Sequence, residues 1–184
     1  MTNARPLSIA RLASACVRLT VACVLLAGCT TVERVMLVAP DLGARWVLLP
    51  IANHTETPQA GLRAEAIAET ALRALGVRQL ERYPAALNPE GLLEPAERKV
   101  AEEAMKWAKS REARYGLTGA VEEWRYKVGV DGEPAVGLTL SVVDLQSGAV
   151  VYSAAGGKSG WSREALSAVA QKLVKELLAG IPGR

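Results

Sequence analysis

The chain has 184 residues, 50% of them hydrophobic, and its 22 basic residues exceed its 19 acidic ones, giving a net charge of +3. The whole excess lies in Arg5, Arg11 and Arg18, within an N-terminal stretch that contains no acidic residue. Without that stretch the chain is neutral, so the electrostatic argument for a nucleic-acid-binding protein is lost.

Residues 1–28 have the organisation of a bacterial lipoprotein signal peptide. The basic residues are followed by a short apolar run over residues 19–27, and Leu26-Ala27-Gly28-Cys29 forms a lipobox. The apolar run is shorter than the ~20 residues that a membrane-spanning helix needs. We therefore predict that residues 1–28 are cleaved. Cys29 would then carry acyl chains such as palmitate, which anchor a protein to a membrane without crossing it.

Two further expectations follow from this leader. Thr30 stands where an aspartate would favour inner-membrane retention in enteric bacteria, so we expect an outer-membrane lipoprotein whose body faces the periplasm. Cys16 and Cys23 leave with the leader and Cys29 is acylated. The mature chain then has no cysteine for a disulfide, for thiol catalysis or for a metal site.

The first half of the mature chain predicts a strand followed by a helix. An apolar run at residues 46–51 indicates a buried strand, which the polar loop at residues 53–57 ends. Thr57 and Pro58 are candidates for the N-cap and first residue of a helix that Gly76 terminates. Its inner face carries apolar residues at spacings of three and four: Ala64, Ile67, Ala68, Ala71, Leu72 and Leu75.

The second half predicts, in chain order, a brief strand, a helix, three strands and a last helix, at residues 77–81, 95–114, 115–128, 135–144, 149–155 and 163–178. The turn signals Asp131-Gly132 and Ser147-Gly148 separate the three strands. The order β-α-β-α-β-β-β-α predicts an α/β (α+β) fold, with three helices packed on a mixed sheet of about five strands.

These elements divide the mature chain into two parts. Residues 29–45, with the lipidated cysteine at their start, are predicted to be a tether. Residues 46–184 have the length and patterning of one periplasmic domain.

Catalytic chemistry finds little support in this sequence. His54 is the only histidine, so a zinc site lacks ligands, and no nucleophile-elbow motif accompanies it. The stretch from Gly156 to Ser159 resembles the end of a phosphate-binding loop, but Tyr152 stands where that motif needs glycine. Glu122 and Glu123 are adjacent on a predicted strand and should point to opposite faces. We predict a protein without catalytic residues, metal or cofactor.

Trp161 with Lys158 is the first of three candidate binding features. The pair lies in a glycine-containing loop before the last helix, where an exposed indole beside a cation would suit a membrane interface. The alternative is a hydrophobic staple, with Ser162 as N-cap and Trp161 packed on Leu166.

The other two candidates lie on the predicted hairpin. Trp124, Tyr126 and Val128 share one strand face, either as core under the helices or as an exposed aromatic surface. Asp131 and Glu133 lie at the turn, either as solvated turn residues or, repeated around an oligomer, as a ring of negative potential.

Two stretches carry a family resemblance. Residues 46–58 (WVLLPIANHTETP) resemble the opening strand and loop of periplasmic lipoproteins with a TolB-N-terminal-like fold, LpoB-type and CsgG-type proteins among them. Residues 115–161 (YGLTGAVEEWRYKVGVDGEPAVGLTLSVVDLQSGAVVYSAAGGKSGW), continued by SREAL, are more specific. They resemble the PelC family, the outer-membrane lipoproteins of the Pel exopolysaccharide system, over nearly all of the domain.

This resemblance implies a function without enzymatic activity. Proteins of the family form a ring of about twelve subunits beneath the outer membrane, near the PelB export channel. The acidic opening of the ring guides a cationic polysaccharide that builds biofilm matrix. By the same resemblance Trp161 would contact the membrane, and Asp131 would lie at the acidic opening.

Two rival functions remain open. An LpoB-type lipoprotein would dock on a peptidoglycan synthase and activate it, but such a protein normally needs a long tether. Here only about sixteen residues separate Cys29 from Trp46, spanning at most ~55 Å. A carboxylate-based glycan hydrolase would need two convergent acids in a cleft.

Overall fold

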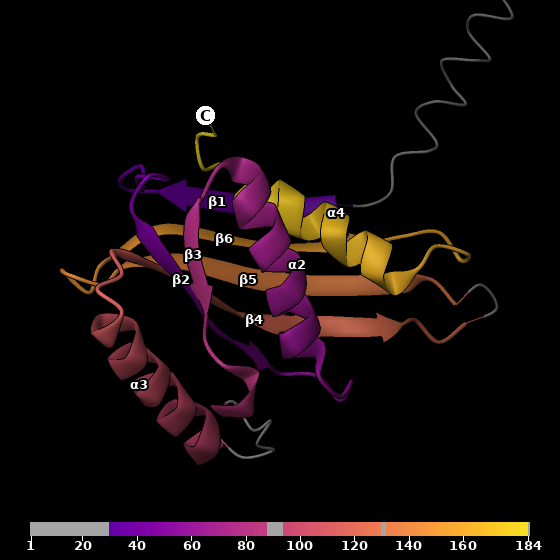
Figure 1. Ribbon diagram of the computed structural model, residues 1–184. Coiled ribbons are helices and arrows are strands. Elements are labelled where there is room, and N and C mark those ends of the chain that lie inside the picture. The colour runs from indigo at the N-terminus through magenta and orange to yellow at the C-terminus, as the bar shows by residue number, and fades with distance from the viewer. Residues whose placement is uncertain (1–29, 88–93, 130–131, 184) are drawn as a thin grey trace, which may run out of the picture.

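The computed structural model describes residues 30–87, 94–129 and 132–183, with the backbone alone for residues 94–97. Within these ranges the chain forms a six-stranded mixed sheet in the order β1-β6-β5-β4-β2-β3. β1, β6, β5 and β4 pair antiparallel, whereas β2 is parallel to both β4 and β3. α2 and α4 lie side by side on one face, and α3 stands apart beside β2 (Figure 1).

The strands are β1 (Thr30–Met36), β2 (Arg45–Asn53), β3 (Gln79–Arg82), β4 (Tyr115–Tyr126), β5 (Pro134–Asp144) and β6 (Val150–Ser159). The helices are α2 (Ala60–Leu75), α3 (Glu94–Ser110) and α4 (Leu166–Leu178), with a 3-10 turn, η1 (Ala85–Leu87), after β3. The described part of the chain therefore confirms the predicted α+β class and its three helices, with one strand more than expected.

β2 is apolar from Trp46 to Ala52, and it is covered on both faces. Trp46 and Leu48 belong to the main core under α2 and α4, whereas Val47 and Leu49 pack with Ala104 and Ala108 of α3. Successive side chains of a strand point to opposite faces, so this alternation places α3 across the sheet from the other two helices. The continuous apolar run in the sequence is typical of such a doubly covered strand.

The helices on the main face follow from their apolar stripes. α2 buries Ala64, Ala68 and Leu72, and it ends at Gly76, whose φ of 109° few other residues adopt. α2 begins at Ala60, with Gln59 rather than Thr57 as the N-cap residue. The Thr57 hydroxyl instead donates a hydrogen bond of 2.5 Å to the carbonyl oxygen of Trp124, which ties the start of the helix to β4.

The main correction to the expected organisation concerns the N-terminal segment. Residues 30–36, expected within a tether, form strand β1, and all seven pair with β6, from Thr30 opposite Lys158 to Met36 opposite Tyr152. β1 is an edge strand with mostly exposed side chains. It therefore lacks the apolar alternation by which half-buried strands are found in a sequence.

Candidate functional site

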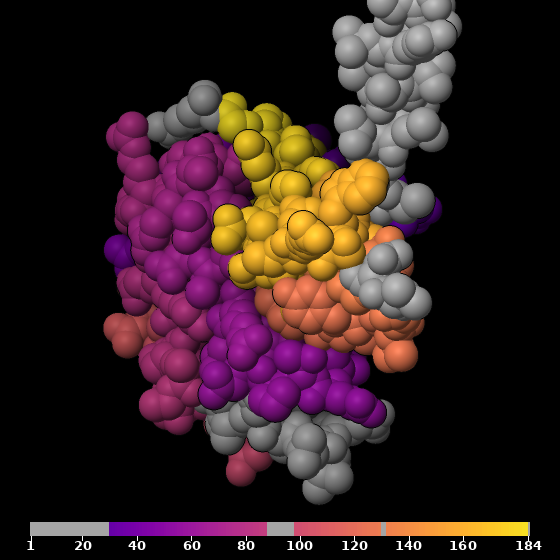
Figure 2. Space-filling view, turned by 90° about the vertical axis from the view of Figure 1, so that its right-hand side faces the viewer, coloured from indigo at the N-terminus to yellow at the C-terminus, as the bar shows by residue number. Residues whose placement is uncertain are grey.

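Three segments meet at one end of the sheet, which we call the anchor end: Thr30 at the start of β1, the β4–β5 hairpin, and the loop of residues 160–165 between β6 and α4. The strand register joins them, since Thr30 lies opposite Lys158 and Ala135 lies opposite Ser159. The Gly160 amide also donates to the carbonyl of Pro134 at 2.9 Å. Figure 2 looks onto this end and shows the start of α4 beside the hairpin.

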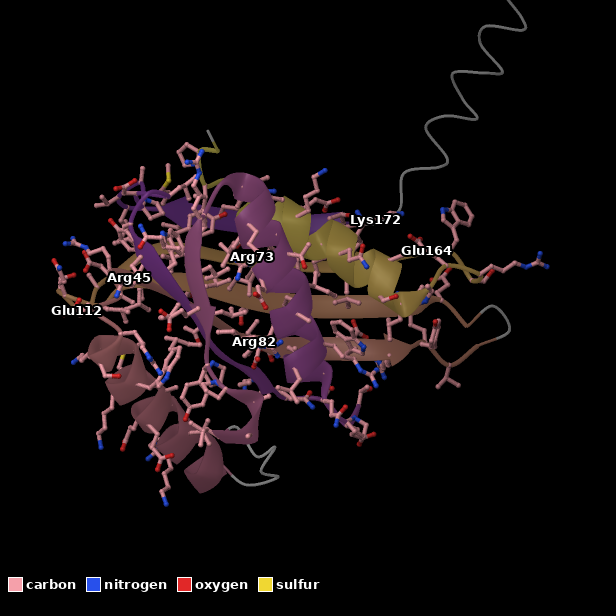
Figure 3. The ribbon with its side chains drawn as sticks, in the orientation of Figure 1. Arg45, Arg73, Arg82, Glu112, Glu164 and Lys172 are labelled. Carbon is pink, nitrogen blue, oxygen red and sulfur yellow. The ribbon has the colours of Figure 1, made fainter. Side chains whose placement is uncertain are left out.

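Trp161 is exposed at the anchor end, with 58% of its surface accessible. α4 begins at Leu166 with Ala165 as its N-cap residue, so the staple with Ser162 as N-cap does not form. The loop is held by Glu164, whose carboxylate accepts a bond of 2.5 Å from Lys172 (Figure 3). The pKa of Glu164 is lowered, and the hydrogen bond from Lys172 is the largest cause. Of the two interpretations of Trp161, the structure supports the exposed one.

Lys158 differs from its expected role as an exposed cation beside Trp161. Its side chain is only 16% exposed and points toward α4, where its ammonium group lies 2.8 Å from the Glu176 carboxylate. The same ammonium group donates to the hydroxyl of Thr30 at 2.7 Å. Lys158 therefore fastens β1 to β6 and α4, a role that depends on packing between segments far apart in the sequence.

The hairpin acids are only partly described. Asp131 lies outside the described residues. Glu133 is half-exposed and has Lys127 at 4.0 Å, while the Lys127 ammonium group donates to the hydroxyl of Ser159 at 2.7 Å. The negative charge of Glu133 therefore has a nearby positive partner, which the sequence pattern did not indicate.

Trp124, Tyr126 and Val128, which were predicted to share one strand face, differ in burial because the helices cover only part of that face. Trp124 belongs to the core, whereas Tyr126 is half-exposed and Val128 is fully exposed. The Tyr126 hydroxyl accepts a hydrogen bond of 3.2 Å from the amide of Leu166, which links the hairpin to the first residue of α4. Both interpretations of this face thus hold for part of it.

The residues considered for catalysis do not converge. His54 follows β2, as expected, and its Nδ1 lies 3.1 Å from the Glu122 carboxylate. Glu123 pairs instead with Arg125 at 2.9 Å, and the pairing of β4 with β5 is irregular between Val121 and Glu123. The two glutamates therefore do not form the pair of facing acids that glycoside hydrolysis needs.

An open groove of about 540 Å³ lies between α2 and α4. It is lined mainly by small and apolar side chains, with three polar ones, Thr70, Gln171 and Lys175. In the part of the chain that the structure describes, no group of three or more His, Cys, Asp or Glu residues is placed to hold a metal ion.

Residues 35–38 are a feature that sequence analysis missed. Val35, Met36, Leu37 and Val38 are all exposed, at the end of β1 away from the anchor end. Four consecutive apolar residues were the available signal, but their assignment to a tether left them without an interpretation.

Comparisons with known proteins find the same architecture in solved structures. A search of solved structures finds the PelC dodecamer from Paraburkholderia phytofirmans, with 44% identity and a TM-score of 0.72 over 85% of this chain and 99% of that one. A point variant of that PelC, also a dodecamer, matches with 44% identity and a TM-score of 0.73 over 85% of this chain and 100% of that one. A lipoprotein, GNA1162, from Neisseria meningitidis has the same fold at 18% identity, with a TM-score of 0.50 over 75% of this chain and 97% of that one. Neither a scan against family models nor a search of curated proteins finds a match.

The fold is an α+β domain that this chain shares with PelC and with the lipoprotein GNA1162. The chain belongs to the PelC family, as its 44% identity to PelC over nearly the whole of the solved chain establishes. Among the described residues, no helix is both long enough and apolar enough to cross a membrane.

Proposed function

We propose that the protein is an outer-membrane lipoprotein, facing the periplasm, that assembles into a ring and assists export of the cationic Pel polysaccharide for biofilm formation. The observation that carries this proposal is 44% identity to a dodecameric PelC across 99% of that chain. At this identity the fold is retained, and we infer that the mode of assembly is retained with it.

Anchoring rests on Cys29, the acylation site of the lipobox. Thr30, the next residue, already pairs with β6, so the acyl chains would hold the anchor end of the sheet close to the bilayer. The indole of Trp161 lies exposed at this end, and tryptophan is favoured at membrane interfaces. We propose Trp161 as a membrane contact. Lys158 does not share that role in this proposal, because the ammonium group of Lys158 binds Glu176 and Thr30.

The acidic opening would be formed by Asp131 and Glu133, repeated around the ring. A closed ring multiplies a local charge by its subunit number, so a neutral chain can present a negative aperture. At physiological ionic strength the field extends only ~8 Å, so it would act on polymer that passes close by. Because Lys127 lies 4.0 Å from Glu133, Asp131 is the more important acid in this proposal.

The experiment that tests assembly is native mass spectrometry of the mature protein without its acyl chains. We expect an oligomer of about twelve subunits; a strict monomer at micromolar concentration would contradict the ring. The experiment that tests export is deletion of the protein, followed by complementation with the wild type and with Cys29→Ser. Secreted polymer should be restored by the wild type only.

The aperture has its own matched test. Asp131→Asn combined with Glu133→Gln should lower the amount of secreted polymer, whereas Glu112→Gln should not. Glu112 is a suitable control because its side chain is 88% exposed, and it lies at the end of the molecule opposite Glu164 (Figure 3). Equal secretion by both variants would remove the hairpin acids from the proposal.

An LpoB-type activator of a peptidoglycan synthase is the alternative. It is disfavoured because β1 begins at Thr30, immediately after the lipidation site, and leaves no tether with which to reach across the cell wall. For the proposed export function, the partners are the membrane, other copies of the chain, a PelB-like channel and the polymer. We propose that this function needs no cofactor, no metal and no enzymatic activity.

A further inference from the structure

The anchor end has a geometry that lets more than one residue reach a bilayer. The strand register places Thr30, Lys158, Val136 and Trp124 in one row across β1, β6, β5 and β4. Cys29 precedes Thr30 by one residue in the sequence, and on the outward side of the row Trp161 lies three residues beyond it and Val128 four. At ~3.3 Å per extended residue, the last two extend at most ~10–13 Å past Thr30.

The acyl anchor fixes where the bilayer must be. Cys29 is joined to Thr30 by one peptide, so their Cα atoms are ~3.8 Å apart. Thr30 cannot move away from the sheet freely, because its backbone pairs with Lys158 and its hydroxyl accepts from the Lys158 ammonium group. Because no flexible segment would separate the acylated cysteine from the sheet, the anchor end has to face the membrane surface.

We propose that Val128, on the β4–β5 hairpin, is a second point of contact with the lipid surface, besides Trp161. Val128 is fully exposed, and Tyr126 two residues before it is half-exposed. Adjacent strands lie ~4.8 Å apart, so β4 is about 14 Å from β1 across the sheet. Contact at Val128, at Trp161 and at the acyl chains would therefore be spread across the sheet, and it would fix the tilt of the domain as well as its distance from the bilayer.

The charges around Val128 suit phospholipid headgroups. Arg125, on β4, and Lys127, just after it, precede Val128 with side chains 66% and 46% exposed, and Arg163 is exposed in the neighbouring loop. Glu123 lies 2.9 Å from Arg125 and Glu133 lies 4.0 Å from Lys127. An apolar tip among side chains of both charges matches an interface in which acyl chains lie beneath headgroups that carry both charges. A second copy of the chain or an export channel could instead cover the same residue, and the experiment below separates these occupants.

The test uses the mature acylated protein, whose sequence contains no cysteine other than Cys29. Val128→Cys then carries a single free thiol for an environment-sensitive fluorophore. The protein is reconstituted into vesicles of phosphatidylethanolamine and phosphatidylglycerol, with or without spin-labelled lipid as a quencher. Trp161→Cys is the positive control, and Leu37→Cys, 74% exposed just after the other end of β1, is the matched negative control.

We expect the spin-labelled lipid to quench emission at position 128 as strongly as at 161, and to leave position 37 unquenched. Quenching at 161 alone would overturn this inference and leave the proposed function intact. Protection of position 128 from aqueous iodide without lipid quenching would assign it to a protein partner and likewise overturn the inference. The inference rests on the proposed lipid anchor, so a chain that fails to float with the vesicles would overturn both.

Discussion

The carboxylate of Glu65 on α2 lies 2.7 Å from the guanidinium group of Arg82 on β3, although Glu65 itself is only 2% exposed. Its other oxygen accepts a hydrogen bond of 3.1 Å from the amide of Ile51 on β2. One buried side chain thus joins a helix to two parallel strands. Figure 3 shows Arg82 beside α2, on the edge of the sheet.

We predict that Glu65→Ala destabilises the domain by about 3–5 kcal/mol, because the change removes the carboxylate from a partly buried guanidinium group and from the backbone amide of Ile51. The guanidinium group keeps only its weaker bond to the Leu62 carbonyl at 3.3 Å among those described. Urea denaturation measures the free energy of unfolding. Glu69→Ala, which breaks the partly exposed pair between Glu69 and Arg73 on the same helix, should cost less than about 1 kcal/mol. Equal losses for the two variants would show that burial of Glu65 is energetically unimportant.

Acid should destabilise the domain through Asp144. Burial alone would raise the pKa of this carboxyl, but the amides of Gln146 and Ser147 and the Arg114 guanidinium group outweigh burial and lower it. A group with a lowered folded-state pKa contributes stability above its unfolded pKa, near 4, and loses it as the pH falls through the folded value. At pH values under about 4, the denaturant concentration at the unfolding midpoint should therefore decrease as the pH is lowered. The decrease should be smaller in Asp144→Asn. Identical pH profiles would contradict this assignment.

Trp161→Ala should leave stability within about 0.5 kcal/mol of the wild type, because the indole is exposed and forms no staple. The same variant should lower polymer secretion and membrane association if Trp161 contacts lipid. Thermal unfolding of the domain and a secretion assay measure the two effects separately. A clear loss of stability would return Trp161 to a packing role.

Lys158→Met should loosen β1 selectively. The change removes the ammonium group that binds both Thr30 and Glu176, at a cost of about 1 kcal/mol because the pair is partly exposed. Amide hydrogen exchange should rise along Thr30–Met36 and stay unchanged in β4. Lys175→Met, at an exposed position on α4, serves as the control. Faster exchange throughout the sheet would instead indicate global destabilisation.

The parts of the fold that the sequence predicts are those with strong local signals. β5 occupies Pro134–Asp144, one residue from its predicted start, because its apolar residues alternate regularly between two turn signals. α4 starts three residues later than predicted, at Leu166, and Glu164 in the loop before it bonds to Lys172 of the helix. That contact joins the loop to the body of the helix, and the local pattern contains no sign of it.

In the candidate site, too, local features could be predicted and contacts between distant residues could not. The exposure of Trp161 was one of two interpretations, and choosing between them required the position of the helix start. The partners of Lys158 could not be predicted, because Thr30 and Glu176 lie 128 and 18 residues away along the chain. β1 was missed because an edge strand with one neighbour buries too few side chains to leave a periodic pattern.

The pairing of β1 with β6 also sets an order of events in folding. Thr30 can pair only after Lys158 has been synthesised, so β1 is among the last strands to be able to form its hydrogen bonds. Until then the unpaired edge of β6 is open to strands from other chains. The newly made protein thus depends on its own N-terminal strand to cover the exposed edge of β6.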